Sequence, residues 1–247
     1  MAARARLPSM KLAALIFDVD GTLADTERDG HRPAFNAAFS EAGLPWVWDE
    51  ALYGELLAVT GGKERIRHYC ARFQADYPSR PDFEGLVVEL HRSKTRHYLA
   101  RVEAGGIPLR PGVARLIGQA RAAGLRLGVA TTTSAENVSA LLNASLAPDA
   151  TNWFELIAAG DVVPAKKPAP DIYQYVLARM ELPAGACLAL EDSGNGLAAS
   201  RAAGIPTVVT VNDYSRGQDF AGALAVLPDL DAVGLGDLLR LHQDGHL

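Results

Sequence analysis

The sequence lacks the features that mark secreted, membrane-bound and polyanion-binding proteins. Its 247 residues include only two cysteines, Cys70 and Cys187, far apart and outside any CxxC or Cys/His pattern. This argues against a disulfide framework and a zinc site, and it fits a reducing compartment. Basic residues number 24 and acidic residues 29, for a formal net charge of −5. The charge therefore offers no electrostatic footprint for nucleic acid or an anionic membrane.

The chain also lacks a long apolar run. No stretch approaches the roughly 18 uninterrupted apolar residues of a membrane span, and residues 1–9 contain neither an apolar h-region nor a cleavage pattern. We therefore expect a cytoplasmic protein, with residues 1–9 as an N-terminal leader ahead of Met10. An apolar fraction of 49% with 21% charged residues is ordinary for a globular chain. The length favours one core domain with a substantial insertion.

Short apolar runs, typical of strands buried on both faces, alternate with helical patterns bounded by Pro and Gly. The predicted strands cover residues 12–17, 125–130, 156–159, 187–190 and 207–211, and the predicted helices cover 111–123, 170–182 and 196–203. This alternation predicts an α/β fold with a doubly wound parallel sheet, which binds ligands at the carboxyl ends of its strands.

Residues 27–104 break this alternation. They contain amphipathic helical patterns and no convincing strand, and the helices are expected over 33–42, 49–57, 63–73 and 83–102. The segment leaves the sheet just after the polar end of the first strand. We therefore expect a smaller all-helical cap over 27–104, inserted into a Rossmann-like core formed by 10–26 and 105–247.

The strongest chemical signal is the segment Asp18-Val-Asp-Gly-Thr directly after the first strand. Carboxylates at Asp18 and Asp20 stand on the same side of an extended chain, and Gly21 permits a tight turn close to a ligand. Their mutual repulsion demands a cation or a shared proton. Taken alone, the segment could equally be an Asp-rich turn.

Three other strand ends supply matching groups. Thr131 offers a hydroxyl and a backbone N–H to a phosphate oxygen, Lys167 offers a point charge, and Glu191 and Asp192 add carboxylates. Hard oxygen ligands without His or Cys suit Mg²⁺. Each residue also has an ordinary structural interpretation: a strand end, a solvated cation or a helix N-cap. The neighbouring Lys166 leaves open which lysine is the relevant one.

The order of these residues resembles the four motifs of the haloacid dehalogenase (HAD) superfamily, and the resemblance covers nearly the whole chain from Met10 onward. Other segments are similar to the CbbY family, phosphatases of xylulose 1,5-bisphosphate associated with carbon fixation. These segments are residues 22–27, 29–32, 60–66, 91–95 and 131–134.

The resemblance implies a mechanism. Asp18 would be the nucleophile that forms an aspartyl-phosphate, and Asp20 would be the general acid and base. Thr131 and Lys167 would hold the phosphoryl oxygens. The implied cofactor is Mg²⁺, held by Asp18, the backbone carbonyl of Asp20, and Asp192 with help from Glu191.

The resemblance also implies that the substrate is a small phosphorylated sugar. We expect neither nucleic acid nor a membrane as a partner, and we expect a monomeric protein. Alternatives of the same class are a phosphoglycolate phosphatase and a β-phosphoglucomutase-like phosphotransferase; a non-enzymatic alternative is a phospho-accepting switch. The basic residues of the cap would bind a second phosphate, although composition alone suits exposed helix charges equally. The candidate substrate-binding residues are Glu27, Gly61, Gly62, Lys63, Glu64, Arg65, His91, Arg92, Lys94, Thr131, Thr132, Thr133, Ser134, Asn137 and Lys167.

Overall fold

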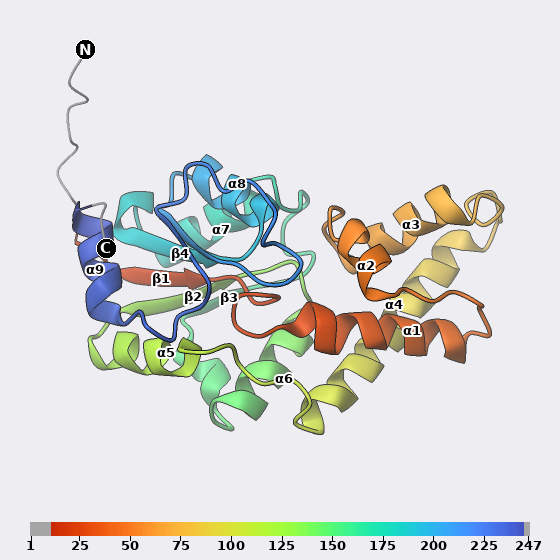
Figure 1. Ribbon diagram of the computed structural model, residues 1–247, viewed down its shortest axis with the longest axis horizontal. Coiled ribbons are helices and arrows are strands. Elements are labelled where there is room, and N and C mark those ends of the chain that lie inside the picture. The colour runs from red at the N-terminus through yellow and green to blue at the C-terminus, as the bar shows by residue number, and fades with distance from the viewer. Residues whose placement is uncertain (1–10, 245–247) are drawn as a thin grey trace, which may run out of the picture.

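The computed structural model describes residues 11–244, whose strands form one parallel sheet in the order β3-β2-β1-β4-β5-β6 (Figure 1). The chain starts in the middle of the sheet and winds outward in both directions, as the α/β prediction requires. The strands are β1 Ala14–Phe17, β2 Arg126–Ala130, β3 Leu156–Ala158, β4 Cys187–Glu191, β5 Thr207–Thr210 and β6 Ala225–Leu227. The predicted leader over residues 1–9 lies outside the described residues.

Helices cover both faces of the sheet: α5 and α6 lie on one face, and α7 and α8 on the other (Figure 1). The helices and helical turns that follow the insertion are α5 Val113–Ala122, α6 Ala135–Ser145, η2 Ala150–Trp153, α7 Asp171–Met180, η3 Ala184–Ala186, α8 Gly194–Ala202 and α9 Leu235–Asp244. This arrangement buries the apolar strands from both sides and leaves their polar carboxyl ends at one edge.

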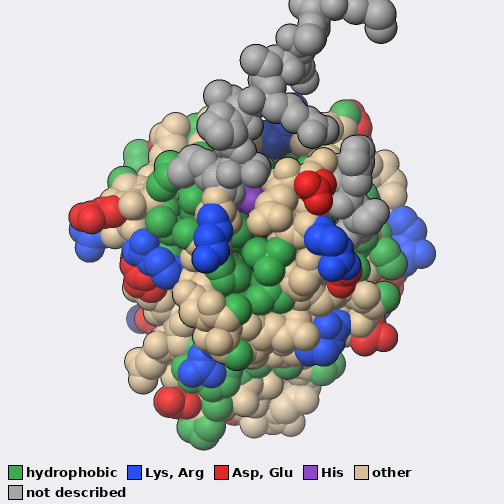
Figure 2. Space-filling view, turned by 90° about the vertical axis from the view of Figure 1, so that its left-hand side faces the viewer, with side chains coloured by type: hydrophobic (Ala, Val, Ile, Leu, Met, Phe, Trp, Pro, Cys, Tyr) green, Lys and Arg blue, Asp and Glu red, His purple; other side chains and the backbone are tan. Residues whose placement is uncertain are grey.

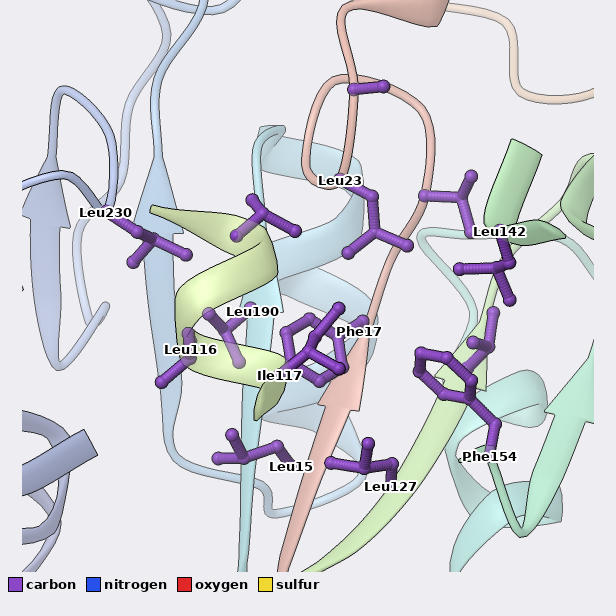
Figure 3. Close-up of a cluster of buried hydrophobic side chains, with 14 of the residues drawn as sticks. Leu15, Phe17, Leu23, Leu116, Ile117, Leu127, Leu142, Phe154, Leu190 and Leu230 are labelled. Atoms are coloured by element: carbon purple, nitrogen blue, oxygen red, sulfur yellow. The ribbon is translucent and has the colours of Figure 1, made fainter. Parts of the chain in front are cut away.

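Alternation along β1 divides its side chains between two hydrophobic clusters. Leu15 and Phe17 pack toward α5, where Leu116 and Ile117 meet them (Figure 3), and Ile16 packs on the opposite face toward α7. All four residues of β1 are buried. The central strand is therefore fixed firmly, and with it the position of Asp18, the residue that follows.

Over its described length, the insertion contains helices joined by loops and turns, and no strand. It comprises η1 Glu27–His31, α1 Arg32–Glu41, α2 Glu50–Leu56, α3 Gly62–Phe73 and α4 Phe83–Glu103. It has its own cluster of buried aromatic and aliphatic side chains, separate from the two clusters of the sheet and including Phe35, Trp48 and Tyr53. In Figure 1 this body stands beside the sheet, next to the carboxyl ends of the strands. We call it the helical cap.

The chain enters and leaves the cap through two paired segments. Ala24 forms an antiparallel bridge with Leu109, and the Arg110 N–H donates to the Leu23 carbonyl over 2.8 Å. The buried Arg110 side chain also donates to the carbonyls of Thr210 and Gly21. The two crossings therefore act as one short connection, fixed at the carboxyl edge of the sheet.

Helices α6 and α9 and strand β6 were not predicted from the sequence, and neither were the short helical segments η1, η2 and η3. Strand β6 is a three-residue edge strand in which Val226 is 49% exposed, so it gives no buried apolar run. Helix α6 begins at Ala135, and the side chain of its N-cap residue, Ser134, accepts from the Asn137 N–H. Sequence analysis had assigned both residues to substrate binding rather than to a helix start.

Among the described residues, no helix is long and apolar enough to cross a membrane.

Figure 2 shows the end of the molecule opposite the cap, where Lys and Arg side chains are interspersed with Asp and Glu around a group of hydrophobic side chains. Both cysteines are buried and free.

Candidate active site

The carboxyl ends of β1, β2 and β4 bring the predicted motif residues together. Asp18 directly follows β1, Thr131 follows β2, and Glu191 ends β4 with Asp192 next to it. Lys167, in the loop before α7, places its Nζ 2.6 Å from Asp18 Oδ1 and 2.7 Å from Glu191 Oε1. Three segments distant in sequence thus converge on one buried ion-pair network, formed by Asp18, Lys167 and Glu191.

The structure distinguishes the two adjacent lysines. Whereas Lys167 contacts Asp18, the Lys166 ammonium lies 2.6 Å from Asp161 Oδ1 and donates to the Gly160 carbonyl. Asp161 also accepts from Lys63 of the cap over 2.6 Å. Lys167 is therefore the lysine that faces the proposed nucleophile, and Lys166 belongs to a contact between core and cap.

Burial raises the free energy of the ionised side chains in this network. Desolvation raises the pKa of Asp18 to about 7, and the nearby carboxylates of Glu191 and Asp20 add to this effect, which Lys167 opposes. Burial and the carboxylates of Asp18 and Glu191 hold the pKa of Asp192 well above its usual range. Burial alone would lower the pKa of Lys167, but Asp18 and Glu191 raise it instead. The cluster has more negative charge than one lysine neutralises.

Asp18, Glu191 and Asp192 fit a divalent cation. One carboxylate oxygen from each lies within 4.8 Å of the others. Glu191 is fully buried; its Oε1 accepts from Lys167 and Tyr173, and its Oε2 has no partner. Such hard oxygen ligands suit Mg²⁺. Asp18 and Asp192 face the adjoining cavity, whereas Glu191 lies behind them.

The Asp20 carboxylate is held apart from this cluster. Its Oδ1 accepts from the Thr26 hydroxyl over 2.6 Å and lies 2.9 Å from His31 Nε2. Burial opposes the charged form of Asp20, but the charge and hydrogen bond of His31, together with Thr26, outweigh burial and lower its pKa to about 2. Sequence analysis gave no role to Thr26. The His31 ring stacks on Tyr98 with centroids 4.3 Å apart, which fixes its orientation.

The residues after β2 divide into two groups. Thr132, Thr133 and Ser134 line the cavity. The Thr131 N–H instead donates to the Ala158 carbonyl within the sheet, so the prediction that this N–H binds phosphate is wrong, and its hydroxyl remains the candidate donor. Asn137 is buried and donates to the Thr133 hydroxyl over 3.1 Å, so it supports Thr133 and does not line the cavity.

Two adjoining chambers lie between the core and the cap. The first, of about 400 Å³, contains Asp18, Lys167 and Asp192. The second, of about 230 Å³, extends into the cap. Both chambers share Asp20, Glu27, Arg65 and Thr132.

The second chamber has a lining of mixed charge. Lys63, Lys94 and Lys166 reach it from three different segments, and Glu64, Glu136 and Asp161 are among its carboxylates. Lys94 is buried over the rings of Phe35 and Tyr98, and burial lowers its pKa to about 8. The lining also includes Gly61, Gly62, Glu64, Arg65 and His91. Burial, with Lys94 and Lys63 nearby, lowers the pKa of His91 to about 4.

Glu27 and Arg65 join the two chambers through Tyr53, a residue that sequence analysis did not identify. The Tyr53 hydroxyl donates to Glu27 and accepts from Arg65 over 2.9 Å, and the Arg65 guanidinium lies 3.7 Å from Glu27. All three side chains are largely buried. The amphipathic pattern of α2 assigns Tyr53 to the cap core, and only the structure shows that its hydroxyl binds Glu27 and Arg65, which line both chambers.

Arg92 lies outside both chambers. Its side chain is 68% exposed and forms an ion pair with Glu89 on the same helix. The prediction that it faces the crevice is therefore wrong, since it points away from Lys94, two residues later on α4.

Comparisons with known proteins identify the family of the chain. Residues 12–204 match the haloacid dehalogenase-like hydrolase family. The plasmid protein CbbY of Cupriavidus necator is 55% identical over 219 residues, which cover 89% of this chain and 86% of that protein.

Two solved structures of CbbY from Rhodobacter sphaeroides are also similar, each at 43% identity over 92% of this chain and 99% of the other. The complex with phosphate gives a TM-score of 0.83, and a variant in complex with xylulose 1,5-bisphosphate gives 0.84. The chain therefore belongs to the haloacid dehalogenase-like hydrolases and is a phosphoric monoester hydrolase of that family.

Proposed function

We propose that the protein is a Mg²⁺-dependent sugar-bisphosphate phosphatase that converts xylulose 1,5-bisphosphate to xylulose 5-phosphate and phosphate, and thereby removes an inhibitory sugar bisphosphate in carbon fixation. The observation that carries the proposal is the pair of adjoining chambers. The first contains the buried Asp18–Lys167 pair. The second contains the buried Lys94 for a second anionic group, together with Lys63 and Lys166, which are held by Asp161. A bisphosphate can occupy both chambers, which explains how an acidic chain attracts an anionic substrate.

In the first half-reaction, an Asp18 carboxylate oxygen attacks phosphorus, so that the new O–P bond forms as the ester P–O bond breaks. Asp20 gives its proton to the departing sugar alkoxide. Its pKa of about 2 in the free protein rises when an anionic phosphate binds beside it, because a second negative charge disfavours the carboxylate. Lys167 and the Thr131 hydroxyl hold the transferring phosphoryl oxygens.

In the second half-reaction, Asp20 takes a proton from water as the water oxygen attacks phosphorus. The Asp18 O–P bond breaks, and phosphate and the free Asp18 carboxylate are restored. Asp18, Asp192 and the backbone carbonyl of Asp20 would hold Mg²⁺, which would supply positive charge to offset the charge of the phosphoryl group. Glu191 keeps the Lys167 ammonium in place behind these ligands.

The helical cap, proposed as a separate domain over residues 27–104, would close over the bound sugar. Its connection through paired segments at Ala24 and Leu109 suits a hinge. Closure excludes water until the aspartyl-phosphate has formed.

The choice of xylulose 1,5-bisphosphate as the substrate is supported by the CbbY structure with xylulose 1,5-bisphosphate, at 43% identity.

The test is a phosphate-release assay with purified protein, with Mg²⁺ or with a chelator. We expect kcat/KM to be highest for xylulose 1,5-bisphosphate, lower for sugar monophosphates and for phosphoglycolate, and activity to require Mg²⁺. The variant Asp18→Asn should release no phosphate. A preference for phosphoglycolate, or phosphorylation without turnover, would overturn the proposal.

A further inference from the structure

The segment that follows β5, residues 212–215, contacts the metal-binding cluster and the cap at once. Asn212 Nδ2 donates to Asp192 Oδ2 over 2.7 Å. Its Oδ1 accepts from the backbone N–H groups of Tyr214 and Ser215 over 2.9 and 3.1 Å. Because two donors hold this oxygen, the amide nitrogen has to face Asp192. The segment is therefore a closed turn that presents one N–H donor to a carboxylate of the active site.

Gly21 keeps this contact tight from the other side. Its φ is +87°, and a Cβ at this position would lie 2.3 Å from Asp192 Oδ2 and 2.5 Å from Asn212 Nδ2. Only a glycine allows the backbone to approach so closely. Asp192 is thus held between the loop after β1 and the turn after β5, and a small shift of that turn moves its carboxylate.

Two residues later, the same turn packs against the cap. Tyr214 is the one residue from outside the cap that packs against the cap's hydrophobic cluster within the described chain. Its ring lies 6.0 Å from that of Tyr53, centroid to centroid, at an interplanar angle of 66°. It also lies against Gly54, where a Cβ would come within 3.2 Å of the Tyr214 ring. Tyr53 in turn binds Glu27 and Arg65 at the junction of the two chambers.

Asp213, the residue between Asn212 and Tyr214, adds a third contact. Asp213 forms an ion pair of 2.8 Å with Arg28 in η1, where the chain enters the cap. Consecutive side chains of the turn therefore contact Asp192, the base of the cap and the interior of the cap. Asn212, Tyr214 and Ser215 also line the first chamber.

We propose that the turn at residues 212–215 couples the position of the cap to the placement of Asp192, so that metal affinity depends on cap closure. This rests on the proposed function of Asp192 as a metal ligand. Asn212 is a positioning residue that orients Asp192, and Tyr214 is the contact through which the cap acts on it. Such coupling is reciprocal: the closed cap strengthens Mg²⁺ binding, and Mg²⁺ favours closure.

The test measures Mg²⁺ binding to the substrate-free protein by titration calorimetry, which needs no turnover. Asn212→Ala removes the donor to a ligand carboxylate and should weaken Mg²⁺ binding by about 10-fold or more. Tyr214→Ala touches no carboxylate of the cluster, and coupling predicts at least about fivefold weaker binding. Tyr214→Phe should bind as the unaltered protein does, since the Tyr214 hydroxyl has no partner.

Tyr77→Ala is the matched control for lost packing. Tyr77 is a partly buried tyrosine of the same cluster that packs on Trp46 within the cap, so this variant should leave Mg²⁺ affinity unchanged. Unchanged affinity in Tyr214→Ala, or an equal loss in Tyr77→Ala, would overturn the coupling. Asp192→Asn tests the underlying assignment separately: if this variant still binds Mg²⁺ normally, the metal site of the proposed function is wrong, whatever Tyr214 does.

Discussion

Replacing Lys167 by methionine tests the electrostatics of the site most directly. The Lys167 ammonium lies between Asp18 and Glu191, whose side chains are 10% and 0% exposed. The substitution keeps a chain of similar length but leaves both carboxylates without their cation. Removing one partner of a buried pair costs about 3–5 kcal/mol, which for a chain of this size lowers Tm by about 6–20 °C.

The loss should depend on pH in a defined direction. A buried carboxyl whose folded pKa is raised binds its proton more tightly in the folded state, so the folded state gains stability as pH falls through that pKa. Burial already raises the pKa of Asp18 to about 7, and removing Lys167 raises it further. We expect the stability deficit of Lys167→Met to be largest above about pH 8 and to shrink toward about pH 5.

Urea and thermal unfolding in chelator measure the deficit, with Lys166→Met as the matched control. The Lys166 partner, Asp161, is 62% exposed, so the control should lose no more than about 1 kcal/mol. Adding Glu191→Gln to Lys167→Met should recover part of the loss, since it removes one unpaired charge. A deficit below about 1 kcal/mol, or one equal at both pH values, would refute this account of the site.

Three further outcomes follow from the geometry. The metal-free protein should lose stability as pH rises from about 4 to 7, because Asp18 binds a proton more tightly in the folded state than in the unfolded chain. Saturating Mg²⁺ should then raise Tm more at about pH 8 than at about pH 6, and equal gains in Tm would count against the metal site. Asp20→Asn should slow phosphate release by about 10²–10⁴-fold, while calorimetry finds the Mg²⁺ affinity unchanged. Loss of both phosphate release and Mg²⁺ affinity would mean that the Asp20 side chain is a metal ligand. Lys94→Met should lower kcat/KM for the bisphosphate by about 10–150-fold, the effect of one charged hydrogen bond, and leave monophosphates nearly unaffected. Arg92→Met, on the exposed face of the same helix, should change neither, and similar losses for both substrates would exclude Lys94 as a ligand of the second phosphate.

The sequence was sufficient for the core of the site because its signals are local. A buried apolar run followed by a polar residue predicts a strand end, and parallel strands bring such ends to one edge. Asp18, Lys167, Glu191 and Asp192 meet for this reason. The same reasoning applied to the strand predicted over 207–211 would have identified Asn212, the next polar residue along the chain.

Contacts of the cap were harder to predict. Residues two positions apart on a helix point to nearly opposite sides, so Arg92 and Lys94 could not both face the cavity, and the helical period alone could have excluded one of them. The contact between Tyr53 and Tyr214 is different. This contact depends on how the cap docks on the core, and no local sequence pattern predicts that docking. From the sequence alone, each of the two tyrosines is simply an aromatic side chain.

The paired crossings at Ala24 and Leu109, together with a hydrophobic cluster confined almost wholly to the cap, have a consequence for how such an enzyme changes during evolution. Substitutions in the cap's own hydrophobic cluster can reshape the second chamber without disturbing the packing that fixes Asp18. Cap and core share packing at two places: Ala34, Tyr98 and Val102 of the cap belong to the sheet's hydrophobic cluster, and the turn carrying Asn212 and Tyr214 contacts the cap. A transplanted cap would therefore need a complementary surface at Tyr214, and recombination between related enzymes should succeed best when that turn and the cap are inherited together.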